Sequence, residues 1–135
     1  ERLTSYLNKI FRYKSSKIEI SFEVDTHTKL IKNFFKLLKI KNCGITFDTG
    51  NIFVQKKSIS KTFKSIKNVI NHLHIKDRDI FGKNVELGTG LINFKNFFDI
   101  LKKEKYINTI TLETFRCENA ILQASKNINF LKKIL

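Results

Sequence analysis

The sequence predicts an α/β fold in which short strands alternate with amphipathic helices along its 135 residues. Four segments show the apolar–polar alternation of a strand, and each is followed by a stretch with apolar residues at helical spacing. Strands that alternate with helices in this way pair in parallel through right-handed crossovers. With 41% hydrophobic residues, the chain can bury the core of one domain, which we place at residues 1–135.

The predicted strands carry polar side chains on one face only. They cover residues 18–23, 44–48, 71–76 and 108–113. Strands of an open sheet with helices on both sides would be apolar on both faces. The alternation therefore favours a βα-barrel, whose strands turn an apolar side to the helices and, here, a polar side to the interior. The alternative is an α+β layer with one face of its sheet open to solvent.

Ionisable side chains stand at or near the C-terminal ends of these four strands. They are Glu23, Asp48, His74 and Glu113. Active sites of βα-barrels lie at this end of the strands, and carboxylate and imidazole groups are common ligands of divalent metals. The repeat thus indicates half of a barrel with a metal site, a placement that the layered alternative does not explain.

Apolar stripes predict the helices. They cover residues 2–13, 28–40, 60–70, 93–104 and 117–132. Ser58 or Ser60 can cap the third of them. The last helix is expected to bury Ala120, Ile121, Ala124, Ile128 and Leu131.

The basic composition, with a net charge of +14, is the feature that would suggest a nucleic-acid partner. Arginine, whose planar fork suits phosphates and bases, occurs only at positions 2, 12, 78 and 116. The lysines are spread along every helix and do not gather in one block, which indicates solvated helix faces. We therefore do not expect nucleic acid as the partner.

The sequence has no run of about 18 apolar residues, so no membrane span is predicted, and the N-terminus has no signal-peptide pattern. Cys43 and Cys117 fall at opposite ends of the predicted domain, so we expect free thiols in a reducing cytoplasm. The chain opens with Glu1 and contains no Met, which suggests a processed or excised segment.

Several segments resemble one family in the right order and spacing: FEVD, FDTGN, HLHIKDRDIFGKNVELGTGLINF and TLETFR. They are similar to the sugar phosphate isomerase/epimerase family, the xylose isomerase-like TIM barrels that also include the endonuclease IV type of DNA-repair enzyme. Family members have eight strands, and these segments look like strands five to eight. The resemblance implies the C-terminal half of a TIM (β/α)8 barrel. Its two open sheet edges would be closed by an N-terminal portion of the protein or by a second copy in a homo-oligomer.

By this resemblance, Glu23, Asp48, His74 and Glu113 are metal ligands. Three carboxylates and one imidazole suit Mn²⁺, Mg²⁺ or Co²⁺, and Zn²⁺ is also possible. The cation would bind a sugar or sugar phosphate and stabilise the enediolate that forms when a proton is removed. The resemblance makes Glu23 and Glu113 the acid–base pair on opposite sides of the sugar, each with a pKa brought toward neutrality.

Basic side chains in or beside the last two loops are candidates for substrate contact. Arg78, Lys83 and Arg116 suit a phosphate or a sugar hydroxyl, and Asn51 near the second strand end joins them. The loop 79–90 is punctuated by glycines and is long enough to cover the mouth of the barrel.

Two further residues flank the predicted ligand on the third strand. His72 shares the face of His74 one layer deeper and is expected to be a hydrogen-bonded interior residue. Asp77 either orients His74 or Lys76 from behind or serves a turn.

The rival function from another class is an abasic-site endonuclease. Enzymes of that type resemble this chain but need further histidines for three zinc ions. Asn51 stands where one of these would be, and the loop DIFGKNVELGTG contains none. A hydroxypyruvate-type isomerase, an inosose dehydratase-like lyase and a non-catalytic fragment with the same fold also remain open.

Overall fold

Four parallel strands form the sheet that carries the predicted site. The computed structural model describes residues 2–11, 18–38, 40, 42–115 and 117–135. The strands lie in the order β1-β2-β3-β6, with the bounds β1 Ile20–Glu23, β2 Cys43–Asp48, β3 Ile70–Ile75 and β6 Thr109–Leu112. This is the predicted parallel sheet, and it agrees with half of a barrel because the sheet is open, with β1 and β6 at its edges.

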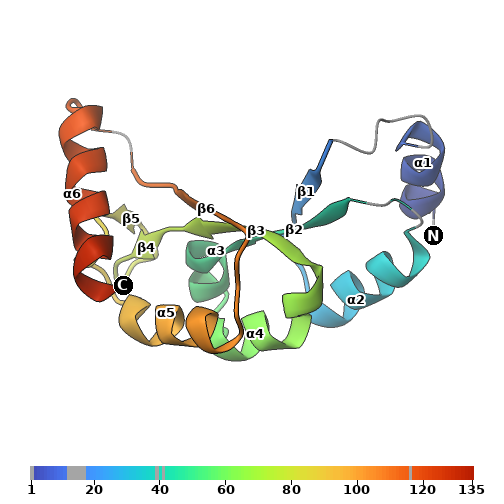
Figure 1. Cartoon of the computed structure of the whole chain (residues 1–135), viewed down its shortest axis with the longest axis horizontal. Helices are drawn as coiled ribbons and strands as arrows, with labels where there is room; N and C mark the ends of the chain where they lie inside the picture. Colours follow the sequence, from blue (N-terminus) through green and yellow to red (C-terminus); the bar gives the residue numbers. More distant parts are fainter. Residues whose placement is uncertain (1, 12–17, 39, 41, 116) are drawn as a thin grey trace.

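Helices cover one side of this sheet and leave the other side open (Figure 1). Along the covered side lie α2 (Thr28–Leu37), α4 (Ile59–Ile66) and α5 (Phe94–Lys103), while α1 (Arg2–Ile10) and α6 (Ala120–Ile134) stand at the two ends. Within the described ranges, no helix has the length and apolar character needed to cross a membrane.

An aromatic cluster joins the sheet to the helices. Phe47 of β2 is 2% exposed, meets Phe63 of α4 edge-on and stacks against Phe97 of α5. Leu73 and Ile75 of β3 are fully buried. Because strand side chains alternate, this packing turns the polar residues of the same strands to the open side, as a barrel interior requires.

The register between β2 and β3 contains one irregularity. Ile45 pairs with Ile70 and Thr46 with His72, so Asn71 has no opposite residue on β2. Asn71 therefore lies on the open side of the sheet next to His72. Its amide reaches across β2 and donates to the Ile20 carbonyl of β1 at 3.1 Å.

Gly44 makes this reach possible. A Cβ atom at Gly44 would lie 2.4 Å from Cγ of Asn71. The amide of Asn71 also accepts a hydrogen bond from the Ser21 hydroxyl at 2.8 Å, and that hydroxyl bonds the Thr46 hydroxyl at 2.6 Å. The floor of the open side is thus tied together across three strands by polar groups.

Two elements were not predicted from the sequence. The first is α3 (Thr49–Val54), a short helix directly after β2 whose N-terminus is capped by Asp48. The second is a hairpin of β4 (Asp77–Arg78) and β5 (Asn84–Val85) within the segment expected to be a long loop. Both are too short to show a periodic apolar pattern.

Helix bounds differ elsewhere by a few residues. Ser58 caps α4, since its hydroxyl accepts from the Lys61 amide at 3.3 Å, and a 3₁₀ turn, η2 (Lys67–Val69), completes the segment predicted as one helix. The helix α2 ends at Leu37, earlier than predicted, because the backbone of Leu38 is extended.

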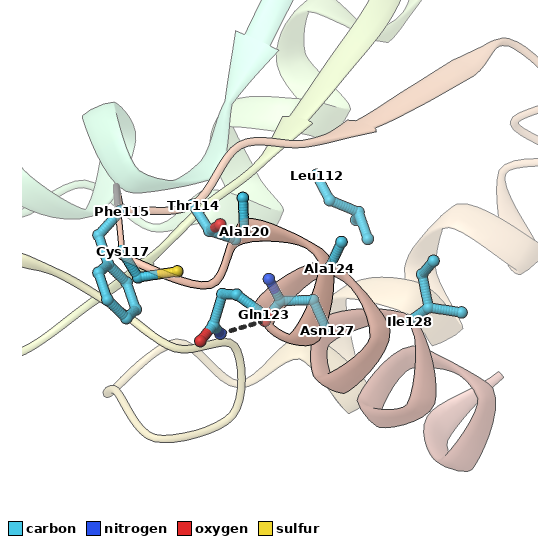
Figure 2. Close-up of a pocket in the computed structure, with 9 residues that line it drawn as sticks. All are labelled: Leu112, Thr114, Phe115, Cys117, Ala120, Gln123, Ala124, Asn127 and Ile128. Carbon is cyan, nitrogen blue, oxygen red and sulfur yellow. Dashed lines mark hydrogen bonds between the residues drawn. The ribbon is translucent and has the colours of Figure 1, made fainter.

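The prediction that α6 buries its apolar stripe was wrong. Ile121 is 82% exposed and Ile128 is 46% exposed, and Ala120 and Ala124 are exposed as well; Leu131 is half-buried. Figure 2 shows Ala120, Ala124 and Ile128 facing a groove together with Leu112. Three residues of the stripe thus line an open groove beside β6, and Leu131 is the member that packs against the core.

The buried face of α6 is polar instead. Gln123 and Asn127 are 7% and 2% exposed, and the Gln123 amide donates to Asn127 Oδ1 at 3.2 Å. That oxygen also accepts from the Leu87 backbone amide at 3.4 Å. These hydrogen bonds offset the cost of burying two amide side chains.

Candidate metal centre

The strand ends bring the four predicted ligands together. The Nδ1 atom of His74 lies 3.6 Å from Glu23 Oε2, 3.9 Å from Asp48 Oδ2 and 2.8 Å from Glu113 Oε2. Ligand atoms of Glu23, Asp48 and His74 all lie within 4.8 Å of one another. Ligands around an octahedral ion with bonds of about 2.1 Å are separated by roughly 3 to 4.2 Å. The distances from His74 Nδ1 to Glu23 and Asp48 fall in this range, so these three residues have a spacing that fits one small cation. Glu113 Oε2 lies nearer to Nδ1, at hydrogen-bond distance.

Two buried atoms at this point, Asp48 Oδ2 and His74 Nδ1, make no hydrogen bond of regular geometry, although the Lys76 ammonium group lies 3.1 Å from the first and Glu113 Oε2 lies 2.8 Å from the second. The other carboxylate oxygen of Asp48 accepts from the Asn51 backbone amide at 2.7 Å, which caps α3 and aims Oδ2 at the centre. A buried polar atom without a hydrogen bond is costly. A cation bound between these two atoms would be coordinated by both, and their chemistry fits the metal that the sequence predicts.

The four side chains differ in exposure. The side chain of Asp48 is 2% exposed and that of His74 is 21% exposed, whereas Glu23 and Glu113 are 45% and 44% exposed. The strand order places Glu23 and Glu113 on or directly after the outer strands β1 and β6, with the buried pair between them. Two accessible carboxylates thus flank two buried ligands.

Lys76 is the site residue that sequence reasoning missed. Its Nζ atom lies 3.1 Å from Asp48 Oδ2 and 2.8 Å from Glu113 Oε1, and the residue is only 6% exposed. Burial by itself lowers the pKa of Lys76, but the carboxylates of Glu113 and Asp48 outweigh this and raise the pKa above its ordinary value. The available signal was its position two residues after His74, on the same strand face.

The contact with Lys76 lowers the pKa of Glu113 below its ordinary value, against the opposing effect of burial. Glu113 is therefore held as a carboxylate. This is the opposite direction to the tuning toward neutrality expected from the sequence, and the reason is the ammonium group that the sequence analysis did not include in the site.

His72 lies below the candidate ligands. Its Nε2 atom is 2.7 Å from the Thr111 hydroxyl, and its ring meets the His74 ring edge-on with centroids 5.2 Å apart. The interpretation of His72 as a hydrogen-bonded interior residue is consistent with these contacts.

Asp77 organises the following loop. It is 1% exposed, and its carboxylate accepts four backbone N–H groups at 2.9 to 3.2 Å, those of Arg78, Gly88, Gly90 and Ile92. Its described contacts include none with His74 or Lys76. Of the two roles considered for Asp77, the turn role is the one that these hydrogen bonds support, and a role in orienting His74 or Lys76 stays a prediction.

The candidate substrate contacts are distributed unevenly. The Asn51 side chain donates to Glu23 Oε1 at 3.2 Å and accepts from the Arg78 guanidinium at 3.4 Å. Asn51 and Arg78 therefore both lie next to the site. Lys83 is exposed, and its two described hydrogen bonds are both made by its backbone with Asp79: its amide donates to Asp79 Oδ1 at 2.8 Å and its carbonyl accepts from the Asp79 amide at 3.0 Å. Arg116 lies outside the described residues.

Both cysteines are free, as predicted. Burial raises the pKa of the Cys43 thiol, which donates to the Ile40 carbonyl at 3.3 Å. Cys117 precedes α6 and lines the groove of Figure 2. Neither contacts the metal centre through a described interaction.

The chain is similar in sequence or in fold to several known proteins. An uncharacterized protein of Methanocaldococcus jannaschii, MJ1614, is 38% identical over 78 residues, which are 55% of this chain and 30% of that protein. The D-allulose 3-epimerase of a Methylomonas species matches 98% of this chain with a TM-score of 0.80 and 20% identity. A probable 3-DHS dehydratase of Bacillus anthracis matches 94% with a TM-score of 0.73 and 15% identity.

The chain spans about half the length of these solved structures, 54% of the epimerase and 55% of the dehydratase. Their similarity establishes the fold of a partial barrel. A family model described as xylose isomerase-like TIM barrel matches residues 6–134. The chain therefore belongs to the xylose isomerase-like TIM barrel family.

Proposed function

We propose that the protein is a divalent-metal-dependent isomerase or epimerase of a sugar or sugar phosphate. The observation that carries this proposal is the pair of exposed carboxylates, Glu23 and Glu113, on either side of the buried Asp48 and His74. Isomerisation and epimerisation beside a carbonyl need a proton removed at one carbon and returned at the same or the next one. Two accessible acid–base groups on opposite sides of one site suit that task.

The buried pair would provide fixed metal ligands. Asp48 is held by its cap on α3, and His74 lies within the central strand β3. A bound Mn²⁺, Mg²⁺ or Co²⁺, or Zn²⁺, would polarise the sugar carbonyl and acidify the neighbouring C–H group. The oxygen-rich ligand set favours the first three ions.

Glu23 and Glu113 would move the proton. Asn51 holds one oxygen of Glu23 and Lys76 holds one oxygen of Glu113, so each carboxylate keeps its second oxygen toward His74. Groups held in this way have a defined orientation for proton transfer. Arg78, joined to Asn51, and the exposed Lys83 are proposed to contact sugar hydroxyls or a phosphate.

The proposal is tested by exchange of a carbon-bound hydrogen. The intact protein is saturated with Mn²⁺ and incubated in D₂O with ketohexoses and their phosphates, and deuterium uptake beside the carbonyl is followed by NMR. We expect Glu23→Gln and Glu113→Gln to slow uptake by at least about a hundredfold. Asp99→Asn, which removes an exposed carboxylate from α5, is the matched control and should leave the rate unchanged.

Metal content is the second measurement. Asp48→Asn is expected to abolish Mn²⁺ binding in calorimetry, because it replaces the buried ligand oxygen or turns a donor toward the ion. If Glu23→Gln and Glu113→Gln both keep full exchange with the metal bound, the proposed roles of these carboxylates are wrong.

A second candidate function for the same site is a lyase that removes water from a polyol ketone, and the dehydratase among the structural relatives supports it. Loss of water from a polyol ketone also begins with removal of a proton beside a carbonyl. Its product contains a conjugated double bond, so a rise in ultraviolet absorbance with no epimer in the NMR spectrum would favour a lyase.

The abasic-site endonuclease has less support. Among the described residues, the cluster with metal-ligand spacing contains one histidine, and Asn51 contacts Glu23 and Arg78. Three zinc ions per site in elemental analysis would favour the nuclease, whereas one divalent ion favours the isomerase.

We also propose that the open edges β1 and β6 are covered in the active protein. The covering part would be the other half of the barrel, supplied by an N-terminal portion of the protein or by a second copy in a homo-oligomer. The half-length match to the solved relatives supports this proposal.

A further inference from the structure

Lys76 is built into the candidate metal centre at both its backbone and its side chain. The Thr49 hydroxyl accepts from the Lys76 amide at 2.9 Å and donates to the Lys76 carbonyl at 2.8 Å. Thr49 itself is fully buried. These bonds fix the residue directly beyond the end of β3, where no strand neighbour would otherwise hold it.

The side chain of Lys76 has little freedom. A Cβ atom at Gly50 would lie 3.0 Å from both Cγ and Cδ of Lys76, so the stem runs against the start of α3 where only a glycine leaves room. The ammonium group ends between Asp48 and Glu113, at 3.1 and 2.8 Å. Burying a lysine here costs free energy unless it balances charge.

The charges of the centre have a definite sum. Glu23, Asp48 and Glu113 carry three negative charges, and Lys76 carries one positive charge, which leaves minus two. A histidine that ligates a metal is neutral. A divalent cation would therefore make the loaded centre electrically neutral, whereas without Lys76 the same ligands would balance a trivalent cation.

We propose that Lys76 sets the charge preference of this centre and makes it select divalent over trivalent cations. The inference rests on the proposed function, because it takes Glu23, Asp48, His74 and Glu113 as the metal ligands. Lys76 is a specificity-determining residue in this view. It acts on the metal through its fixed positive charge and does not bind it.

The expected size of the effect follows from Coulomb's law. The repulsion energy between a unit positive charge and a cation about 5 Å away is proportional to the charge of the cation. It is therefore one and a half times as large for a trivalent ion as for a divalent ion. At an effective dielectric constant of about 20 this difference corresponds to roughly a hundredfold in relative affinity, and solvent near the exposed glutamates reduces it to about tenfold or more. A ratio of affinities is the useful readout, because general damage to the site weakens both ions together.

The test titrates the intact protein with Mn²⁺ alone and with Tb³⁺ alone. Calorimetry gives the Mn²⁺ dissociation constant, and terbium luminescence gives that of Tb³⁺. Lys76→Met, which keeps the length of the side chain, is expected to shift the affinity ratio toward Tb³⁺ by at least about tenfold. Lys76→Arg keeps the charge and should leave the ratio within about twofold of the wild-type value.

Two further variants make the result decisive. Lys32→Met removes an equal charge from the exposed face of α2 and should not change the ratio. Lys76→Gln removes the charge but keeps a polar end that can bond Asp48 and Glu113, so it replaces Lys76→Met if that variant does not fold.

The outcomes separate this inference from the proposed function. Mn²⁺ binding by the wild type with an unchanged ratio in Lys76→Met and Lys76→Gln would overturn the inference alone. Equal weakening of both ions would assign Lys76 a purely structural role and would overturn it as well. Failure of the wild type to bind any Mn²⁺ would contradict the proposed function and the inference with it.

Discussion

The carboxylate of Asp77 holds a loop together by accepting hydrogen bonds from four of its backbone N–H groups. Its two oxygens accept backbone N–H groups from residue 78 to residue 92, and so they gather the hairpin and the glycine-rich turn around one carboxylate. The turn can approach because Gly90 has no side chain, since a Cβ atom there would lie 2.3 Å from Asp77 Oδ1. The motif HIKDR…LGTG therefore has a structural cause for its aspartate and its last glycine.

Asp77→Asn is expected to lower the free energy of unfolding by about 3 kcal/mol or more. The amide nitrogen would turn a donor toward backbone donors and leave at least one buried N–H group without a partner. Denaturant unfolding followed by circular dichroism measures the loss. Asp99→Asn on the exposed face of α5 is the control, with an expected effect below about 0.5 kcal/mol. Equal effects of the two substitutions would contradict this account of Asp77.

Gly44→Ala is predicted to cost about 1 to 3 kcal/mol, because the new methyl group would displace Asn71 from its hydrogen bonds across the sheet. In an Asn71→Ala background the same substitution should be neutral or stabilising, since alanine suits a strand better than glycine does. A double-mutant cycle from unfolding curves measures this coupling. Additive costs would show that the two residues do not share the space.

At the scale of elements, one face of α6 packs on the core through Phe130 and another face lines an open groove. Phe130 meets Phe94 edge-on with ring centroids 6.1 Å apart, and its ring leaves no room for a side chain at Gly88. Gly88 also has a φ of 87°, which favours glycine for a second reason. This contact anchors α6, while Ala120, Ala124 and Ile128 face the groove of Figure 2.

Phe130→Ala should therefore destabilise residues 1–135 by about 2 to 4 kcal/mol, and Ile128→Ala by less than about 1 kcal/mol. The reason is that Phe130 packs on the core whereas Ile128 is 46% exposed. Urea unfolding of the two variants checks the difference. If Ile128 proves as costly as Phe130, then the stripe packs within this half of the barrel after all.

The sequence was informative where a side chain's role depends on its own strand or helix. The alternation of β1 and of β3 from His72 onward placed Glu23 and His74 on the open face, and one of the two serines offered as a cap, Ser58, caps α4. It was uninformative where the partner is remote in sequence. The contacts of Lys76 with Asp48 and Glu113, and the bond from the Leu87 amide to the buried Asn127, join residues 28 to 40 positions apart. The stripe of α6 was misassigned because periodicity shows that a face is apolar, not which surface covers it.

At the scale of the whole molecule, apolar grooves lie at both ends of the sheet. Near β1, a groove is lined by side chains that include Leu3, Val24 and Leu30, which are 60%, 40% and 56% exposed. Near β6, Phe98, Ile110 and Leu131 line a second groove. Exposed apolar surface of this kind marks an interface, and its position at both open edges agrees with the proposed closure of the barrel.

Residues 1–135 alone are therefore predicted to self-associate at micromolar concentrations. The net charge of +14 opposes association through repulsion, so added salt should strengthen it. Light scattering during gel filtration at low and high salt provides the measurement. Leu30→Lys should weaken association by placing a charge in the groove. A monomer under all these conditions would contradict the prediction.

The extra residue at Asn71 is what lets Ile70 face the helices while His72 and His74 face the open side. Without Asn71, Ile70 and His72 would pair with Ile45 and Thr46 as neighbours in an unbroken ladder, and His74 would stay opposite Asp48. The bulge therefore adds a third polar side chain to this face of β3 without moving the imidazole. Its loss would remove only the amide that joins β3 to β1, and the four strand ends would keep their relative positions.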